Sequence, residues 1–412
     1  MNNNIADTNM KPIKVISLLT AACLIGDSML YIALPTHWQE TGLSSLWEVG
    51  ALLSANRIVR LPLNPLVGWL YKRINTKSGI IFAALLAVIT TACYGLVSGF
   101  IPLLLVRCIW GLAWTFFRLG AYITIIDCSN DFNRGHCMGM YNGLFRLGSL
   151  VGMLGGGFLA DLYGLRTTAL IFGGVMLCAL PAAFFGIPRA KGGNKSSEEI
   201  KTTHKPIFWK DQDILWALIT GMLVAMIYQG MFTATLSYLV QAHNSPIINI
   251  FGFMIGAASL AGILQAIRWG WEPWLAPWIG KKSDGKNGRR TILVISLVFG
   301  GCLFMLTPLN IPLILWLLVL TGLQFTATAL TTLSDATASD AASRSSKVVV
   351  MTAYSLSIDF GAAVGPFAGY LLNGYVGTYA AYWLAAVVLL LISAGWLFYQ
   401  PSKLVLQDIR KA

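Results

Sequence analysis

Long apolar stretches, separated by short polar gaps, recur along the whole chain. A helix needs roughly 20 apolar residues to cross the hydrocarbon core of a bilayer, so each stretch predicts a membrane-spanning helix. The pattern predicts twelve spans, at residues 13–38, 46–71, 79–98, 101–126, 136–160, 167–187, 214–241, 248–279, 291–309, 312–334, 348–372 and 378–399. The expected fold class is an all-α membrane protein with twelve transmembrane helices.

The longest polar gap, from Pro188 to Asp213, combines glycine, serine and charges of both signs, which is typical of a linker. It divides the predicted spans into two sets of six. We therefore expect an N-terminal six-helix bundle at 1–187, a cytoplasmic linker at 188–213 and a C-terminal six-helix bundle at 214–412.

The two halves contain a repeat, because the stretch from Tyr141 to Gly164 matches the stretch from Tyr354 to Gly377. The matching glycine pairs are Gly148 and Gly361, Gly152 and Gly365, Gly156 and Gly369, and Gly164 and Gly377. Glycines four residues apart form one stripe of a helix, where a neighbouring backbone can approach closely. The pattern predicts two related bundles in a parallel pseudo-repeat.

Charged residues make up 11% of the chain and hydrophobic residues 56%. Soluble globular chains carry about 25% charged residues, so this composition indicates a membrane protein. The net charge of +12 does not predict nucleic-acid binding, because the basic residues lie in short gaps between apolar runs. If the N-terminus is cytoplasmic, most of the 29 Lys and Arg fall on the cytoplasmic side. The positive-inside rule then predicts cytoplasmic N- and C-termini in a multi-pass plasma membrane protein, such as one of a bacterial inner membrane.

No sequence feature requires a metal or a cofactor. The seven cysteines include no Cys-x-x-Cys pair, so neither a disulfide framework nor a zinc site is indicated. We expect a monomer embedded in the lipid bilayer.

Two loops that follow related helices carry similar motifs. The second-half loop reads Gly280-Lys-Lys-Ser-Asp284-Gly-Lys-Asn-Gly-Arg289-Arg, and the first-half loop reads Gly68-Trp-Leu-Tyr-Lys72-Arg73. With Arg107-x-x-x-Gly111 and the glycine stripe that begins at Gly148, these motifs make the chain resemble the major facilitator superfamily over essentially its whole length. The stripe resembles the motif of the drug and metabolite:proton antiporter branch, although Met153 stands where that motif has proline.

The resemblance implies a secondary transporter whose first, fourth, seventh and tenth helices line a central cavity. It also implies that helices 2 and 11, and helices 5 and 8, meet between the halves. The loop residues Gly68, Lys72, Arg73, Gly280, Asp284 and Arg289 would then belong to the loops that control the conformational change.

Ionisable side chains inside the predicted spans are functional candidates, since each costs about 2.5–3.5 kcal/mol to insert into a bilayer. The candidates are Asp27, Arg57, Arg60, Arg107, Arg118, Arg146, Arg268, Glu272 and Asp359. Positive charges outnumber negative ones in this set. The excess favours an anionic substrate.

The repeat and the implied helix contacts predict two gating pairs. Arg60 and Glu272 are equivalent positions, as are Arg146 and Asp359. The predicted pairs are Arg60 with Asp359 and Arg146 with Glu272. They would brace one closed state, or they are static bridges that serve folding.

Six side chains are candidates for substrate binding. Arg107 and Arg118 are 11 residues apart and therefore share one face of a helix, and the planar fork of arginine suits carboxylate and phosphate. The alternative for Arg107 is a structural or coupling role. The full set is Arg118, Arg107, Arg57, Tyr31, Gln229 and Trp269.

Asp27 and Asp359 are the candidates for proton coupling. A desolvated carboxylate at Asp27 could carry a proton. A permanent salt bridge to an arginine of the second or fourth helix is an equal alternative. Gln229 is the expected counterpart of Asp27 in the second half.

The sequence contains no HExxH, GxSxG or Walker motif, so it does not predict an enzyme. A receptor without transport remains open and would bind ligand without flux. Among transporters, the glycine motif favours proton-coupled export of a small anionic or amphipathic compound, such as a carboxylate-bearing metabolite, a chelator or a drug. The alternatives are import by proton symport and movement of an anionic lipid.

Overall fold

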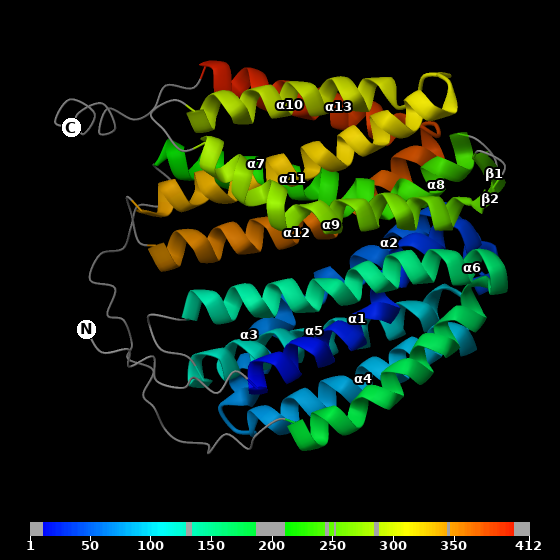
Figure 1. Cartoon of the computed structure of the whole chain (residues 1–412), viewed down its shortest axis with the longest axis vertical. Coiled ribbons are helices and arrows are strands. Elements are labelled where there is room, and N and C mark those ends of the chain that lie inside the picture. Colours follow the sequence, from blue (N-terminus) through cyan, green and yellow to red (C-terminus); the bar gives the residue numbers. More distant parts are fainter. Residues whose placement is uncertain are drawn as a thin grey trace. The chain divides into compact units, whose positions relative to one another are not determined.

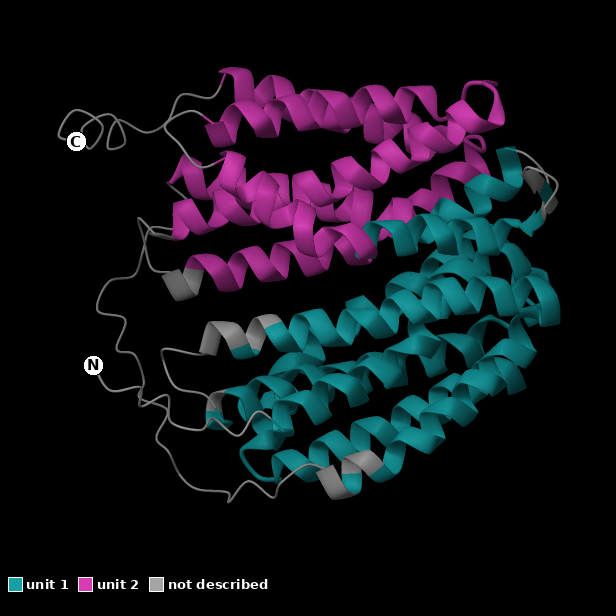
Figure 2. Ribbon diagram, viewed as in Figure 1, with its two compact units in different colours: residues 1–195, 234–269 teal, residues 196–233, 270–412 magenta. Residues whose placement is uncertain are grey.

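The computed structural model describes residues 11–128, 134–186, 211–243, 247–250, 253–283, 288–343 and 347–398. These residues form two compact units. Unit 1 contains residues 1–195 and 234–269, and unit 2 contains residues 196–233 and 270–412 (Figure 2). The units differ from the predicted bundles in residues 234–269. The predicted boundary at 188–213 stays a prediction.

Unit 1 is built mainly of helices (Figure 1). They are α1 (Lys11–His37), the short 3₁₀ segment η1 (Trp38–Thr41), α2 (Leu46–Ile58), α3 (Arg60–Tyr71), α4 (Thr76–Leu96), α5 (Phe100–Cys128), α6 (Arg134–Gly186), α8 (Thr233–His243) and the first half of α9 (Ala257–Ser283). Strands β1 (Ile247–Ile250) and β2 (Phe253–Gly256) precede α9.

Unit 2 contains the second half of α9 and the remaining helices. These are α7 (Gln212–Val224), the π-helical segment η3 (Ala225–Phe232), α10 (Gly288–Leu306), α11 (Leu313–Ser343), α12 (Lys347–Tyr375) and α13 (Ala380–Phe398). The fold class is the all-α membrane class that the sequence predicts.

The described part of the chain contains nine helical stretches long and apolar enough to cross a membrane. One of them, Met140–Pro181 in α6, includes most of two predicted spans. The helix turns at Gly164, whose φ of 77° is readily adopted only by glycine, and the chain doubles back there (Figure 1). The predicted span 46–71 is likewise divided at Val59 into α2 and α3. The count of twelve spans therefore stays a prediction.

The predicted helix over 248–279 is wrong at its beginning. Residues Ile247–Ile250 and Phe253–Gly256 pair as antiparallel strands, and helix α9 begins only at Ala257. The isoleucines of the first strand are β-branched, which favours a strand, and this local preference overrides the apolar pattern of a span.

The glycine stripes pack against helix backbones, as their spacing predicts. In unit 1, Cβ atoms on Gly148, Gly152 and Gly156 of α6 would collide with Ala21, Ile25 and Met29 of α1. Those three positions are also four residues apart. This contact, here called the glycine seam, fixes α6 on α1 in a membrane, where van der Waals contact rather than water exclusion holds helices together.

Unit 2 repeats the glycine seam. Cβ atoms on Gly361 and Gly365 of α12 would collide with the backbone carbonyls of Met222 and Met226, in α7 and η3. The two halves of the repeat thus use the same stripe against the corresponding helix. Each unit therefore contains a pair of helices that pack through the same glycine stripe.

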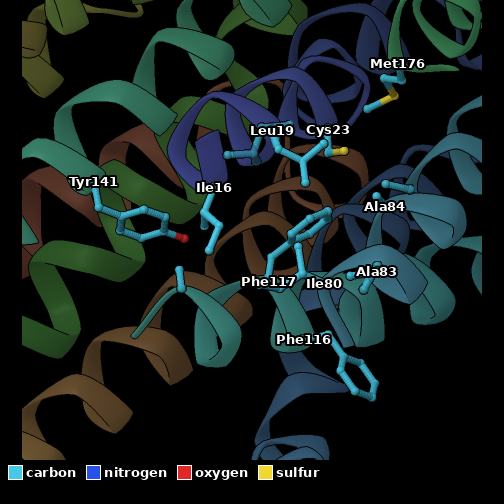
Figure 3. Close-up of a cluster of buried hydrophobic side chains, with 14 of the residues drawn as sticks. Ile16, Leu19, Cys23, Ile80, Ala83, Ala84, Phe116, Phe117, Tyr141 and Met176 are labelled. Carbon is cyan, nitrogen blue, oxygen red and sulfur yellow. The ribbon is translucent and has the colours of Figure 1, made fainter. Parts of the chain in front are cut away.

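The core of unit 1 is formed by α1, α4, α5 and α6 (Figure 3). Phe117 of α5 and Ile80 of α4 lie in its middle, next to Cys23 of α1. Tyr141 of α6 lies at one end, beside Ile16 (Figure 3). This packed core holds in place the polar groups that α1 and α5 carry on other faces.

The glycine seam predicts the effect of one methyl group. We expect Gly148→Ala to destabilise the protein by about 1–3 kcal/mol, because the new Cβ meets the backbone of Ala21. Gly143→Ala is the matched control on the same helix, since nothing lies within 4 Å of its Cβ position. Alanine is intrinsically a better helix former than glycine, so the control should be neutral or stabilising. Thermal unfolding in detergent measures both, and an unchanged midpoint in Gly148→Ala would contradict the seam.

Candidate substrate and coupling site

A buried ion pair joins α1 to α5. The carboxylate of Asp27 pairs with the guanidinium of Arg107, and the two residues are only 8% and 1% exposed. Asn56 of α2 donates a hydrogen bond from Nδ2 to Asp27 Oδ1 at 3.2 Å. Arg107 Nε donates to the Leu52 carbonyl of α2 at 2.9 Å. The pair therefore connects three helices.

Gly111 explains how α2 comes within reach of Arg107. A Cβ on Gly111 would lie 2.7 Å from the Asn56 carbonyl oxygen and 3.3 Å from its Cα. Only glycine allows this approach of α5 to α2. The Arg107-x-x-x-Gly111 motif thus has two parts. Arg107 supplies the charge, and Gly111 leaves room for α2 to bring the Leu52 carbonyl close to Arg107.

Tyr31 and Arg57 extend the same cluster. The Tyr31 ring centroid lies 5.8 Å from Arg107 Cζ and 5.9 Å from Arg57 Cζ, within the range of cation–π contact. Arg57 Nε donates to the Tyr31 hydroxyl at 3.4 Å, and this hydroxyl donates to the Leu53 carbonyl at 3.4 Å. Four residues predicted from the sequence therefore lie together: Asp27, Tyr31, Arg57 and Arg107.

The sequence analysis did not single out two members of this cluster. Asn56 bonds Asp27, and Tyr94 of α4 accepts a hydrogen bond from Arg107 Nη1 at 3.5 Å. Both are neutral polar residues in apolar spans. A neutral polar side chain costs less free energy to insert into a bilayer than a charged one, so such residues stand out less in the sequence.

The surroundings of Arg107 favour its structural or coupling role over direct substrate contact. Its Nη2 atom is buried without a hydrogen-bond partner among the described residues. Leu52, Tyr94 and Arg107 are among the residues that line a cavity of about 10 Å³ at this point, close to the volume that one water needs. The predicted contact of Arg107 with substrate stays a prediction.

Arg118 lies in a separate, half-buried place on α5 among aromatic side chains. Its Nε donates to the Tyr122 hydroxyl at 3.3 Å, and its Cζ lies 5.8 Å from the Tyr122 ring. The Tyr122 ring contacts Tyr141 of α6 at 6.3 Å, and Tyr141 contacts Phe145 at 5.0 Å. Phe145 contacts Trp114, one turn before Arg118, at 5.7 Å. We call Arg118 and these four rings the Arg118 cluster.

Trp269 of α9 lies between two arginines. Its ring centroid is 5.3 Å from Cζ of Arg146 on α6 and 5.4 Å from Cζ of Arg268. All three residues belong to unit 1. The Trp269 ring thus contacts guanidinium groups of the protein itself, and its predicted role in substrate binding stays a prediction.

The remaining predicted partners lie in unit 2, and the gating pairs stay predictions. Asp359 is half-buried on α12, and Glu272 is half-buried on α9. Arg60 donates from Nε to the Asn56 carbonyl at 2.9 Å within unit 1. Each predicted pair combines one residue of unit 1 with one of unit 2.

At the level that corresponds to Asp27, unit 2 has neutral side chains. In unit 2 the glycine seam includes Met226. Tyr228 lies two residues after Met226, and Gln229 lies three residues after it. The Tyr228 hydroxyl bonds Thr326 of α11 at 2.9 Å, whereas Gln229 is half-buried in η3. A hydroxyl pair therefore takes the place of the ion pair of unit 1.

The predicted loop residues lie at helix ends. Gly68 lies in α3, Lys72 and Arg73 follow its end, and Arg73 Cζ lies 4.0 Å from the Trp69 ring. Gly280 lies near the end of α9, and Asp284 lies outside the described residues.

Arg289 of the second loop pairs with Asp340 at the end of α11, a partner that the sequence analysis did not identify. Among the described residues, no group of three or more His, Cys, Asp or Glu could hold a metal ion.

Long apolar helices, glycine-packed helix pairs in both units and a buried ion pair in unit 1 are features of a multi-pass membrane protein. The chain belongs to the major facilitator superfamily, whose family model matches residues 16–282 and 273–411. The family consists of transporters and not enzymes, in agreement with the sequence motifs.

Known proteins of this family are similar to the chain along most of its length. An uncharacterised MFS-type transporter of Methanocaldococcus jannaschii is 25% identical over 79% of this chain and 82% of its own. Multidrug resistance protein MdtG of Salmonella choleraesuis is 24% identical over 71% of this chain and 72% of its own. A multi-drug resistance efflux pump PmrA homologue of Lactococcus lactis is 23% identical over 65% and 64%.

Solved structures share the fold. A bacterial homologue of the human lysosomal transporter Spinster has a TM-score of 0.72 and 15% identity, with 95% of this chain and 96% of that chain covered. A POT family transporter in complex with 5-aminolevulinic acid has a TM-score of 0.73 and 13% identity, over 93% and 95% of the two chains.

The ion pair predicts a large effect of removing one charge. We expect Asp27→Asn to reduce the free energy of unfolding by about 3–5 kcal/mol, because Arg107 is left buried without a counter-charge. The double variant Asp27→Asn/Arg107→Met should recover much of that loss. Arg57→Met is the control for loss of an arginine in the same cluster and should cost less. Thermal unfolding of purified variants measures all three, and additive losses in the double variant would contradict the pairing.

Proposed function

We propose that this transporter exports a small anionic or amphipathic organic compound and couples export to proton entry. The observation that carries the proposal is the separation of two arginines on one helix. Arg107 is buried against a carboxylate, and Arg118, three turns further on, is half-buried among aromatic rings. One arginine is suited to coupling and the other to binding.

Arg118 has the chemistry to bind an organic anion. Its guanidinium carries a permanent charge and several donors, and the rings around it offer apolar surface. An anion that also carries a ring or an alkyl chain would contact both the guanidinium group and the aromatic rings. This combination supports an amphipathic substrate over an inorganic ion.

Asp27 is the proposed proton carrier, acting through its ion pair with Arg107. Protonation would remove its negative charge and leave Arg107 without a counter-charge in the interior of unit 1. That state is costly, so it would favour any conformation in which Arg107 finds another partner or water. A proton on Asp27 can in this way shift the population of transporter conformations.

The relatives support the direction of transport. Two of them are named as a multidrug resistance protein and a multi-drug resistance efflux pump homologue. Export of this kind would place the chain in the bacterial inner membrane with both termini in the cytoplasm. Import by proton symport is the alternative, in which Asp27 and an incoming anion are loaded together.

Flux measurements test the proposal. We expect anions with an apolar group to trigger proton movement in proteoliposomes under an imposed pH gradient, and carboxylate chelators belong in the screen. Arg118→Ala should raise the KM for the anion by about tenfold or more, since hydrogen bonds to charged groups contribute about 1.5–3 kcal/mol. Asp27→Asn should abolish proton movement.

The matched control is Arg166→Gln. Arg166 is an exposed arginine of unit 1 whose guanidinium donates to Ser98 at 2.7 Å and which belongs to neither cluster. Its loss should leave flux unchanged. Substrate flux without proton movement, still intact in Asp27→Asn, would rule out Asp27 as the carrier and indicate uniport or anion exchange.

A further inference from the structure

Helix α9 carries a buried glutamine with nothing to bond. Gln265 is 0% exposed, and among the described residues neither Oε1 nor Nε2 has a hydrogen-bond partner. The indole Nε1–H of Trp269, one turn later on the same face, is also buried without a partner. Buried polar atoms are almost always hydrogen-bonded, so three unpartnered atoms within one turn make this turn a candidate binding point for a polar ligand.

The same turn carries positive charge. Arg268 of α9 and Arg146 of α6 both place their Cζ atoms within 5.4 Å of the Trp269 ring centroid. These distances keep the two guanidinium groups within about 11 Å of each other, close to one Debye length at physiological salt. This turn therefore brings two guanidinium groups to one indole ring.

Close packing of α6 on α9 fixes these groups. A Cβ on Gly157 would lie 2.5 Å from the Ala258 carbonyl oxygen, and one on Gly262 would lie 2.6 Å from the Met153 carbonyl oxygen. Asp161 accepts hydrogen bonds from the backbone N–H and the hydroxyl of Ser259, both at 2.6 Å. Ala258, Gly262 and Trp269 are spaced so that they lie on one face of α9. The polar turn is therefore held on a rigid helical pair.

We propose that Gln265, Arg268 and Trp269 of α9, together with Arg146 of α6, form an anion site that takes the carboxylate of a 2-hydroxycarboxylic acid. The proposal rests on the proposed function and names the substrate class. One carboxylate oxygen accepts from Trp269 Nε1–H and the other from Gln265 Nε2–H, and the guanidinium groups of Arg146 and Arg268 attract the anion. Gln265 Oε1 is left as an acceptor, which a hydroxyl next to the carboxylate satisfies. An ammonium group there would be repelled by the arginines.

Three probes of similar shape test the anion site on the purified, full-length protein. They are mandelate, phenylacetate, which lacks the hydroxyl, and phenylacetamide, which lacks the charge. Apparent affinities are taken from the ligand-dependent rise of the unfolding midpoint at constant ionic strength. We expect mandelate to bind about tenfold more tightly than phenylacetate, and phenylacetamide to have no effect.

The variants separate the site from general stability. Gln265→Leu should lose the preference for mandelate and weaken both carboxylates, although it removes an unpartnered buried amide and should not reduce stability. Trp269→Phe keeps a ring for the arginines but loses the N–H, and should weaken both carboxylates about tenfold. Gln324→Leu on α11 is the matched control, since Gln324 is also 0% exposed with both polar side-chain atoms unpartnered.

Three outcomes would overturn the anion site. They are absence of binding by both carboxylates, wild-type affinity in both Gln265→Leu and Trp269→Phe, and an equal loss in Gln324→Leu. The flux assay in proteoliposomes is independent of this test. Carboxylate binding that depends on Gln265 without any flux would reject the transport proposal and keep the site, whereas anion-driven flux with unchanged affinity in Gln265→Leu would do the reverse.

Discussion

The ion pair between Asp27 and Arg107 is the interaction on which the polar interior of unit 1 depends. Two charges that are almost fully buried hold α1, α2 and α5 together, through the carboxylate on one side and the Leu52 carbonyl on the other. Neither charge can lose its partner at this place without a large cost in free energy. The positions of these three helices are therefore tied to one pair of buried, oppositely charged groups.

The repeat duplicates the packing of the helices but not the polar groups that they carry. Both units use glycines of the same stripe to bring a helix against a backbone carbonyl, at Gly148 in one and Gly361 in the other. The polar groups on that scaffold differ, because unit 1 has the Asp27–Arg107 pair and unit 2 has the hydroxyls of Tyr228 and Thr326. At corresponding positions of the seam, one unit thus carries a buried charge pair and the other carries hydroxyl groups.

Much of the fold could be predicted because a bilayer imposes strong rules on a sequence. Long apolar runs and glycine stripes identify helices and their contacts, and charged residues in spans stand out because they are costly to insert. The strand pair before Ala257 and the break at Val59 could not be predicted, since both lie in apolar sequence where local backbone preference decides. Neutral polar residues such as Asn56 and Gln265 carried no comparable signal, and only their burial shows their importance.

Helix α6 is the element through which these parts can influence one another. It contacts α1 through Gly148, α5 through Phe145, and α9 through Arg146 and Gly157. Phe145 and Arg146 are consecutive, so the Arg118 cluster and the anion site on α9 lie on neighbouring faces of α6 at nearly the same level. Because the glycine contacts involve backbone atoms with no room to yield, a shift of α1 would carry α6 with it. Under the proposed function, proton binding at Asp27 and anion binding would then act on the same helix, which would couple the two sites.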